Sequence, residues 1–154
     1  FLIKDGKIET IDEFGIGGRN FSHALSEKFG LSEERAKALK DRYSEESLSR
    51  EVKERIKESL SGTLEDWFFF LKSKLKNSKG LLPSVIFLFG ENSLLPELEE
   101  VLEEGDWDKL SFNGQIEVKF IYPEQLTQNF YAEDKTHALN TPKEINQFLL
   151  YYGA

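Results

Sequence analysis

Cysteine and methionine are both absent from this chain of 154 residues, and only two histidines, His23 and His137, are present. Without cysteine the chain can form no disulfide, no thiolate zinc site and no cysteine nucleophile. Two histidines far apart in the sequence also exclude a metal site built mainly from imidazole ligands. We therefore expect neither a catalytic residue nor a metal site of these kinds. Because the chain begins at Phe1, we expect an excised piece of a larger protein.

Long hydrophobic runs are missing as well. No segment approaches the roughly 20 apolar residues that a membrane-spanning helix requires, and the first residues do not form a secretory signal. The expected location is the cytoplasm, or the inner face of the membrane through the larger protein. The 20 Lys and Arg residues against 28 Asp and Glu residues give a net charge of −8. Negative charge disfavours contact with nucleic acid and anionic lipid, so we expect neither as a direct partner.

Hydrophobic side chains are otherwise plentiful. They make up 39% of the residues and include 13 Phe, 5 Tyr and 2 Trp. This composition is ample for a folded core and unlike that of a disordered chain. We expect one packed domain over residues 1–154.

Strand signals occur at the start, the middle and the last third of the chain. Residues 1–4 and 7–14 flank Asp5-Gly6, a dipeptide typical of a two-residue turn, so an N-terminal β-hairpin is predicted. An uninterrupted apolar run at 84–89 predicts a strand buried on both faces, as in a parallel sheet. Alternation at 116–122 predicts a further strand.

Two helices are predicted after the hairpin. Phe21, Leu25 and Phe29 recur at four-residue spacing, and Gly30 follows as a helix-terminating residue. Ser32 is the predicted cap of the second helix.

A break is expected at Ser61-Gly62, since glycine disfavours the interior of a helix. A new helix is predicted to begin at Thr63, which forms a capping box with Asp66. Phe69 and Phe70 make the apolar face of this helix unusually wide, which predicts burial on two sides or contact with a partner.

Two more helices are predicted toward the C-terminus. One is capped by Ser93, and because residues 91–108 contain many acids and no base, we interpret its charges as a solvated face. The other begins at Thr141-Pro142, where proline suits the first helical position. Its apolar face is formed by Ile145, Phe148 and Leu149. The elements together predict an α/β domain, with a mixed sheet that includes the N-terminal hairpin and is flanked by helices.

Two glycine-containing turns, at 15–18 and 90–93, each join a predicted strand to a predicted helix. Glycine lets a ligand approach the backbone, and the start of a helix offers free N–H groups to a phosphate. The common Gly-x-x-x-x-Gly-Lys and Gly-x-Gly-x-x-Gly phosphate motifs are both absent. We interpret His23 as a surface residue of the first helix and not as a catalytic base.

The order of these motifs resembles the second half of the actin-like ATPases, in particular the group of the bacterial cell-division protein FtsA and the type IV pilus protein PilM. The resemblance rests on the hairpin around Asp5-Gly6, the turn at 15–18, the segment 29–40 and the strand and turn at 85–98. It implies domain II of an actin-like (ribonuclease H-like) ATPase fold, truncated within its first strand at Phe1.

The resemblance also implies a site for ATP with Mg²⁺. Gly17 and Gly18 would lie near the phosphates, and Glu34 with Lys37 or Lys40 near the ribose and base. The other side of the nucleotide would be lined by Gly90, Glu91, Asn92 and Ser93. The family's phosphate loop, metal-positioning acid and catalytic water site would precede Phe1, so this chain alone is not expected to hydrolyse ATP.

Two functions remain open as hypotheses. The first is a nucleotide-binding domain fragment of an FtsA- or PilM-like protein in cell division or in pilus or filament assembly. Its partners would be other copies of itself or other assembly proteins, and it would reach the membrane only through the larger protein. The second is a degenerate relative that serves as a scaffold or interaction module without turning over nucleotide. Glu91 and the loss of two family glycines at 90–93 favour the second hypothesis. The retained Gly17-Gly18 pair and the set of Glu34, Lys37 and Lys40 favour the first.

Overall fold

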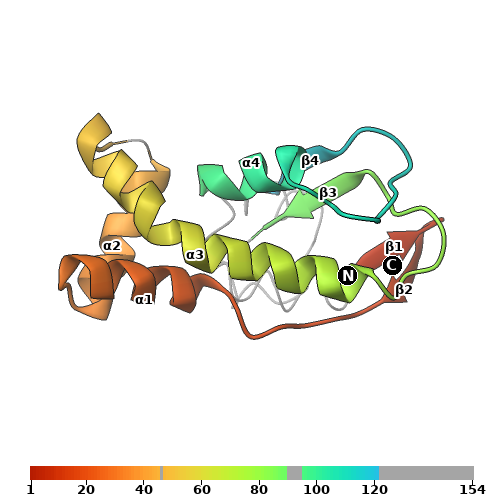
Figure 1. Ribbon diagram of the computed structural model, residues 1–154, viewed down its shortest axis with the longest axis horizontal. Helices are drawn as coiled ribbons and strands as arrows, with labels where there is room; N and C mark the ends of the chain where they lie inside the picture. The colour runs from red at the N-terminus through yellow and green to blue at the C-terminus, as the bar shows by residue number, and fades with distance from the viewer. Residues whose placement is uncertain (46, 90–94, 122–154) are drawn as a thin grey trace, which may run out of the picture.

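A computed structural model describes residues 1–45, 47–89 and 95–121 of the chain (Figure 1). In chain order the elements are β1 (Leu2–Lys4), β2 (Lys7–Thr10), α1 (Gly18–Phe29), α2 (Glu33–Ser44), α3 (Arg50–Leu75), β3 (Val85–Leu88), α4 (Pro96–Glu104) and β4 (Glu117–Phe120). The mixed α/β class predicted from the sequence is confirmed. The predicted helix at Thr141 and the glycine turn at 90–93 lie outside the described residues.

The N-terminal hairpin forms as predicted. β1 and β2 pair antiparallel, and the turn between them places Asp5 at φ 52° and Gly6 at φ 71°. Two successive positive φ angles are those of the turn that Asp-Gly favours. The second strand ends at Thr10 and not at residue 14, because β1 begins at Leu2, opposite Thr10, and offers the later residues no partner.

The prediction of one mixed sheet is wrong for the described residues, in which β1–β2 and β3–β4 are two separate sheets. β3 and β4 pair in parallel, as the apolar run at 84–89 predicted. That strand is not buried on both faces, however, since Phe87 is 55% exposed. Only one face of this sheet packs on the core among the described elements.

The end signals of the first two helices are confirmed. Gly30 closes α1 at φ 61°, and the Ser32 hydroxyl caps α2 by accepting a hydrogen bond from the N–H of Arg35 (3.4 Å). Residues 30–32 connect the two helices, which pack against each other, and in the view of Figure 1 α2 crosses α1 steeply.

The break predicted at Ser61-Gly62 is wrong, because α3 continues through Gly62 to Leu75. A helical glycine costs about 1 kcal/mol relative to alanine. Burial of an apolar side chain stabilises by about 1.5–3 kcal/mol, and α3 buries Ile56 and Leu60 before Gly62 and Phe68 after it. Packing on both sides of the glycine therefore outweighs its local preference. None of the described helices has both the length and the apolar character needed to cross a membrane.

The described residues form two hydrophobic core clusters along α3. The first cluster joins α1, α2, the N-terminal half of α3 and the start of α4. The second cluster joins the C-terminal half of α3 with α4, the residues after α4 and β4. Trp67 and Leu88 pack against both clusters. Figure 1 shows α3 as the axis of the molecule, with α1 and α2 at one end and the β1–β2 hairpin at the other.

Candidate functional site

The glycine turn before α1 presents open backbone. Gly17 is the N-cap of α1, and its N–H donates to the side-chain oxygen of Asn20 (3.0 Å) while its carbonyl accepts from the N–H of Asn20 (2.9 Å). Its φ of −157° is extended, which any residue adopts, and a Cβ at this position would meet no atom within 4 Å. The fold itself therefore does not require glycine at position 17.

Lys40 on α2 is 2% exposed and points toward α1. Its ammonium donates a hydrogen bond to the hydroxyl of Ser22 (3.2 Å), which is itself buried. Ser22 follows Gly18 by four residues, about 6 Å along the helix axis. The ammonium and the positive N-terminal end of α1 thus lie in the same region, and both favour a negative group nearby. No acidic residue occupies the first turn of α1.

The other two charged residues of the predicted site lie farther along α2. Glu34, in its first turn, precedes Lys40 by six residues, which is about 9 Å along the axis. Because only residues 30–32 separate the end of α1 from the start of α2, Glu34 lies close to the end of α1 at Gly30 and away from Gly17. Glu34 and Lys37 are both exposed. Of the two lysines predicted as alternatives, Lys40 is the one that the structure brings to the start of α1.

A buried acid that the sequence analysis missed lies next to this region. Glu97, in the first turn of α4, is 5% exposed and accepts a hydrogen bond from the hydroxyl of Tyr43 through Oε1. Tyr43 follows Lys40 by three residues on α2. Burial, and then the hydrogen bond and the charge of Glu97, raise the pKa of the Tyr43 hydroxyl far above its usual value. The pair connects α2 directly to the start of α4.

The second oxygen of Glu97 is also buried, and among the described residues it has no hydrogen-bond partner. The interpretation of the acidic segment as a solvated face is therefore wrong for Glu97. It holds for Glu100, which is about half exposed and pairs with Lys57 on α3 (2.7 Å). A sequence signal existed, because Glu97 precedes Val101 by four residues and so lies on the apolar side of this helix.

The structure thus gathers Ser22, Lys40, Tyr43 and Glu97 from three helices, next to the first core cluster. Gly90, Glu91, Asn92 and Ser93 fall outside the described residues and are not placed by the structure. The predicted role of Ser93 as helix cap is wrong. Leu95 is the N-cap of α4, because Pro96, which suits the first helical position, fixes the start of the helix.

His23 lies on the surface of α1, as predicted. Its Nε2 is 3.6 Å from a carboxylate oxygen of Glu27, one turn later, and both side chains are exposed. Among the described residues, no group of three or more histidine or acidic side chains is arranged to hold a metal ion.

In comparisons with protein-family models, curated proteins and solved structures, no significant match to this chain is found. The functional argument therefore rests on the sequence motifs and on the geometry around α1, α2 and α4.

Proposed function

We propose that this chain is the nucleotide-binding part of an actin-like ATPase of the FtsA and PilM group, acting in cell division or filament assembly. The observation that carries the proposal is the buried ammonium of Lys40, held by Ser22 beside the first turns of α1. That helix begins at a glycine turn with open backbone and no acid in its first turn.

A phosphate suits this arrangement for two physical reasons. Free N–H groups at a helix start bind anions, and the dipole of the helix favours negative charge there. The positive charge of the Lys40 ammonium, which Ser22 holds beside the same helix, also attracts an anion. Glycine at position 17, which the fold does not require, leaves room for a ligand to reach the backbone.

Lys37 and Glu34 precede Lys40 by three and six residues on α2, and we assign them to the ribose and base of the nucleotide. Mg²⁺ is commonly held by substrate phosphates with only one or two carboxylates. Hydrolysis would need a positioned water and further charged groups around the phosphate, and we do not assign these roles to the described residues. Within the cell we expect a cytoplasmic location.

Calorimetric titration with Mg-ATP and Mg-ADP tests the proposal. We expect heat of binding with the natural chain and none with Gly17→Val, because the valine side chain would occupy the space through which a phosphate reaches the backbone. The matched control is Gly15→Val, at an exposed position in the same turn where a Cβ also meets no atom within 4 Å. Circular dichroism should show both variants folded.

Two results would contradict the proposal in different ways. No heat at millimolar nucleotide with the natural chain would exclude binding by this domain. Equal binding by the natural chain and by Gly17→Val would show that the phosphates lie elsewhere.

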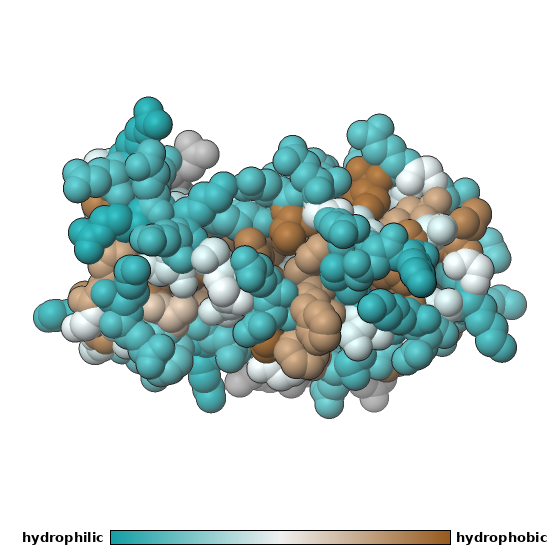
Figure 2. Space-filling view, viewed as in Figure 1, coloured by the Kyte–Doolittle hydropathy of each residue, from teal (hydrophilic) through white to brown (hydrophobic). Residues whose placement is uncertain are grey.

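A second function, as an assembly scaffold without nucleotide turnover, is favoured by one observation. Phe69 and Phe70 on α3 are 60% and 41% exposed, and Phe14 stacks on Phe70 with ring centroids 6.3 Å apart. Figure 2 shows hydrophobic side chains at the surface over the C-terminal half of α3, within an otherwise largely hydrophilic face. Exposed aromatic groups of this kind are typical of contact surfaces.

A further inference from the structure

The parallel sheet β3–β4 has one uncovered face. Ile86, Leu88, Val118 and Phe120 pack on the second core cluster, against α3 and α4. Residues on the opposite face alternate with these, and Phe87 is the most exposed of them in β3. Parallel sheets normally have both faces covered. No described helix covers the Phe87 face, and strand β1 lies across a groove from it.

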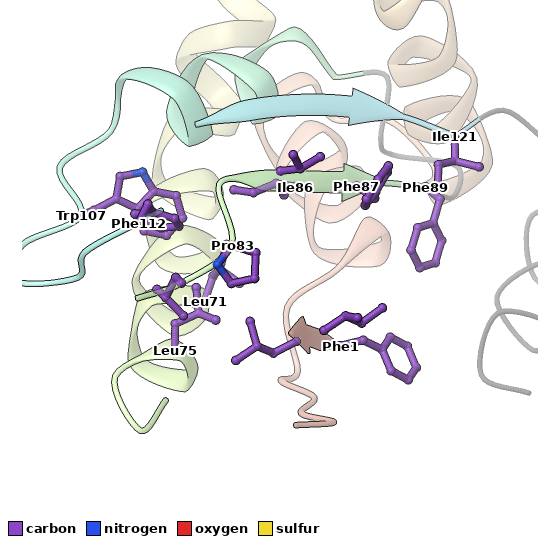
Figure 3. A pocket seen from close by; sticks show the side chains of 14 residues that line it. Phe1, Leu71, Leu75, Pro83, Ile86, Phe87, Phe89, Trp107, Phe112 and Ile121 are labelled. Carbon is purple, nitrogen blue, oxygen red and sulfur yellow. The ribbon is translucent and has the colours of Figure 1, made fainter. Parts of the chain in front are cut away.

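An apolar groove of about 450 Å³ lies beside this face. Figure 3 shows that side chains from β3 and from the C-terminal end of α3 line it, with Phe1 of the hairpin opposite β3. None of the described residues that line it has a charged side chain, and Leu71, Leu75, Phe87 and Phe89 are among those that form its walls. Such a groove fits the apolar side of another element and not a charged ligand.

The end of β4 lies beside the groove, so the C-terminal part of the chain begins there. Ile121, the residue directly after β4, lines it, and the 33 residues that follow (154 − 121) lie outside the described part of the chain. In that segment Ile145, Phe148, Leu149 and Tyr152 stand at the i, i+3, i+4 and i+7 positions of one helix face. The intervening Asn146 and Gln147 are polar.

We propose that residues 142–152 form an amphipathic helix that docks within the same molecule onto the uncovered face of β3–β4, with Phe148 in the groove. The 20 residues at 122–141 extend up to about 66 Å at 3.3 Å each, so the tether does not restrict docking. Attachment in one chain also raises the effective concentration of the helix at the groove into the millimolar range. The inference does not depend on nucleotide binding.

Disulfide trapping tests this docking, and the absence of natural cysteine makes it specific. One variant carries Phe87→Cys with Phe148→Cys. The matched control carries Phe87→Cys with Gln147→Cys, which places the second thiol on the polar side of the same helix. We expect the intrachain disulfide to form about tenfold faster in the first variant, measured by non-reducing electrophoresis and mass spectrometry.

Each other result overturns the proposal. Equal rates in the two variants would indicate a tether that does not dock, and no cross-link in either would place the segment away from the groove. Disulfide-linked dimers that increase with concentration would identify a second copy as the occupant.

A variant without cysteine gives an independent measurement. Phe148→Asp should increase the fluorescence of a dye that binds apolar surfaces by several-fold, whereas Gln147→Asp, with the same added charge, should leave it unchanged. Unchanged dye binding in Phe148→Asp would contradict the docking, provided that circular dichroism shows the chain folded.

Discussion

At the scale of single residues, the hydrogen bond between Tyr43 and Glu97 places a carboxyl group in the interior of the described structure. A buried carboxylate is costly unless hydrogen bonds and charges compensate it. Here the Tyr43 hydroxyl supplies one hydrogen bond, and the N-terminal end of α4 supplies a favourable dipole. Removing the tyrosine hydroxyl would leave the carboxylate without that donor.

We therefore expect Tyr43→Phe to lower the free energy of unfolding by about 2 kcal/mol, since a buried acceptor that loses its partner costs about 1–3 kcal/mol. Urea unfolding followed by circular dichroism measures the change. The control is the double variant Tyr43→Phe with Glu97→Leu, which removes both polar partners and should recover much of the loss. A double variant less stable than the single one would show that Glu97 is satisfied by other groups.

The same pair gives the unfolding free energy a pH dependence. Because burial raises the pKa of Tyr43, the folded chain keeps its proton at a pH where the unfolded tyrosine, with a pKa of about 10, loses it. The unfolded state then binds fewer protons than the folded state, so stability decreases as the pH rises above about 10. In Tyr43→Phe the free energy of unfolding should decrease less steeply above pH 10, because the group responsible is absent. Urea unfolding at several alkaline pH values measures this difference.

The residues of the candidate site show which of its members the sequence predicts and which it does not. Lys40 and Gly17 were predicted as site residues from family motifs, in which each position has a defined role. Ser22, Tyr43 and Glu97 were missed because their hydrogen bonds join different helices, and such contacts depend on how the helices pack. Only the apolar neighbours of Glu97 in the helical pattern indicated its burial.

At the scale of elements, three features determined by neighbouring residues were predicted correctly. The hairpin turn at Asp5-Gly6, the end of α1 at Gly30 and the cap at Ser32 all depend on local backbone geometry. The break at Gly62 was predicted by the same local reasoning and was wrong, because residues distant in sequence bury both halves of α3.

Two glycine substitutions test the confirmed helix end at Gly30 and the continuous helix at Gly62. Gly62→Ala should raise the free energy of unfolding by about 0.5–1 kcal/mol, because alanine favours the helix interior and a Cβ here meets no atom within 4 Å. Gly30→Ala should lower it by about 1 kcal/mol, since alanine disfavours the left-handed backbone found there. Thermal or urea unfolding measures both. A destabilising Gly62→Ala would indicate that α3 is interrupted at this position.

At the scale of the whole molecule, the sequence did not determine whether the strand pairs join into one sheet. The Asp5-Gly6 turn predicts that β1 pairs with β2, but alternation and apolar runs do not say which strands lie beside this hairpin, and β1–β2 remains apart from β3–β4 in the described residues. α3 joins the two halves instead, since it contributes Ile56 and Leu60 to one core cluster and Phe68 to the other.

Net charge and the exposed aromatic side chains of α3 act in opposite directions on self-association. A net charge of −8 repels other copies of the chain, whereas Phe69 and Phe70 offer apolar surface for contact. Salt screens the repulsion and leaves the apolar attraction, since the Debye length decreases from about 30 Å at 0.01 M to about 10 Å at 0.1 M. Association through this surface should therefore increase with salt.

Sedimentation velocity over a range of chain concentrations tests this expectation. We expect the average sedimentation coefficient of the natural chain to increase with concentration at high salt, and that of Phe69→Asp to stay at the monomer value. Ser61→Asp is the control, because it adds the same charge at an exposed position on α3, about 12 Å away along the helix axis. A natural chain that stays monomeric at every salt concentration would exclude this surface as a contact between copies. Equal loss of association in both variants would attribute the effect to charge and not to the aromatic surface.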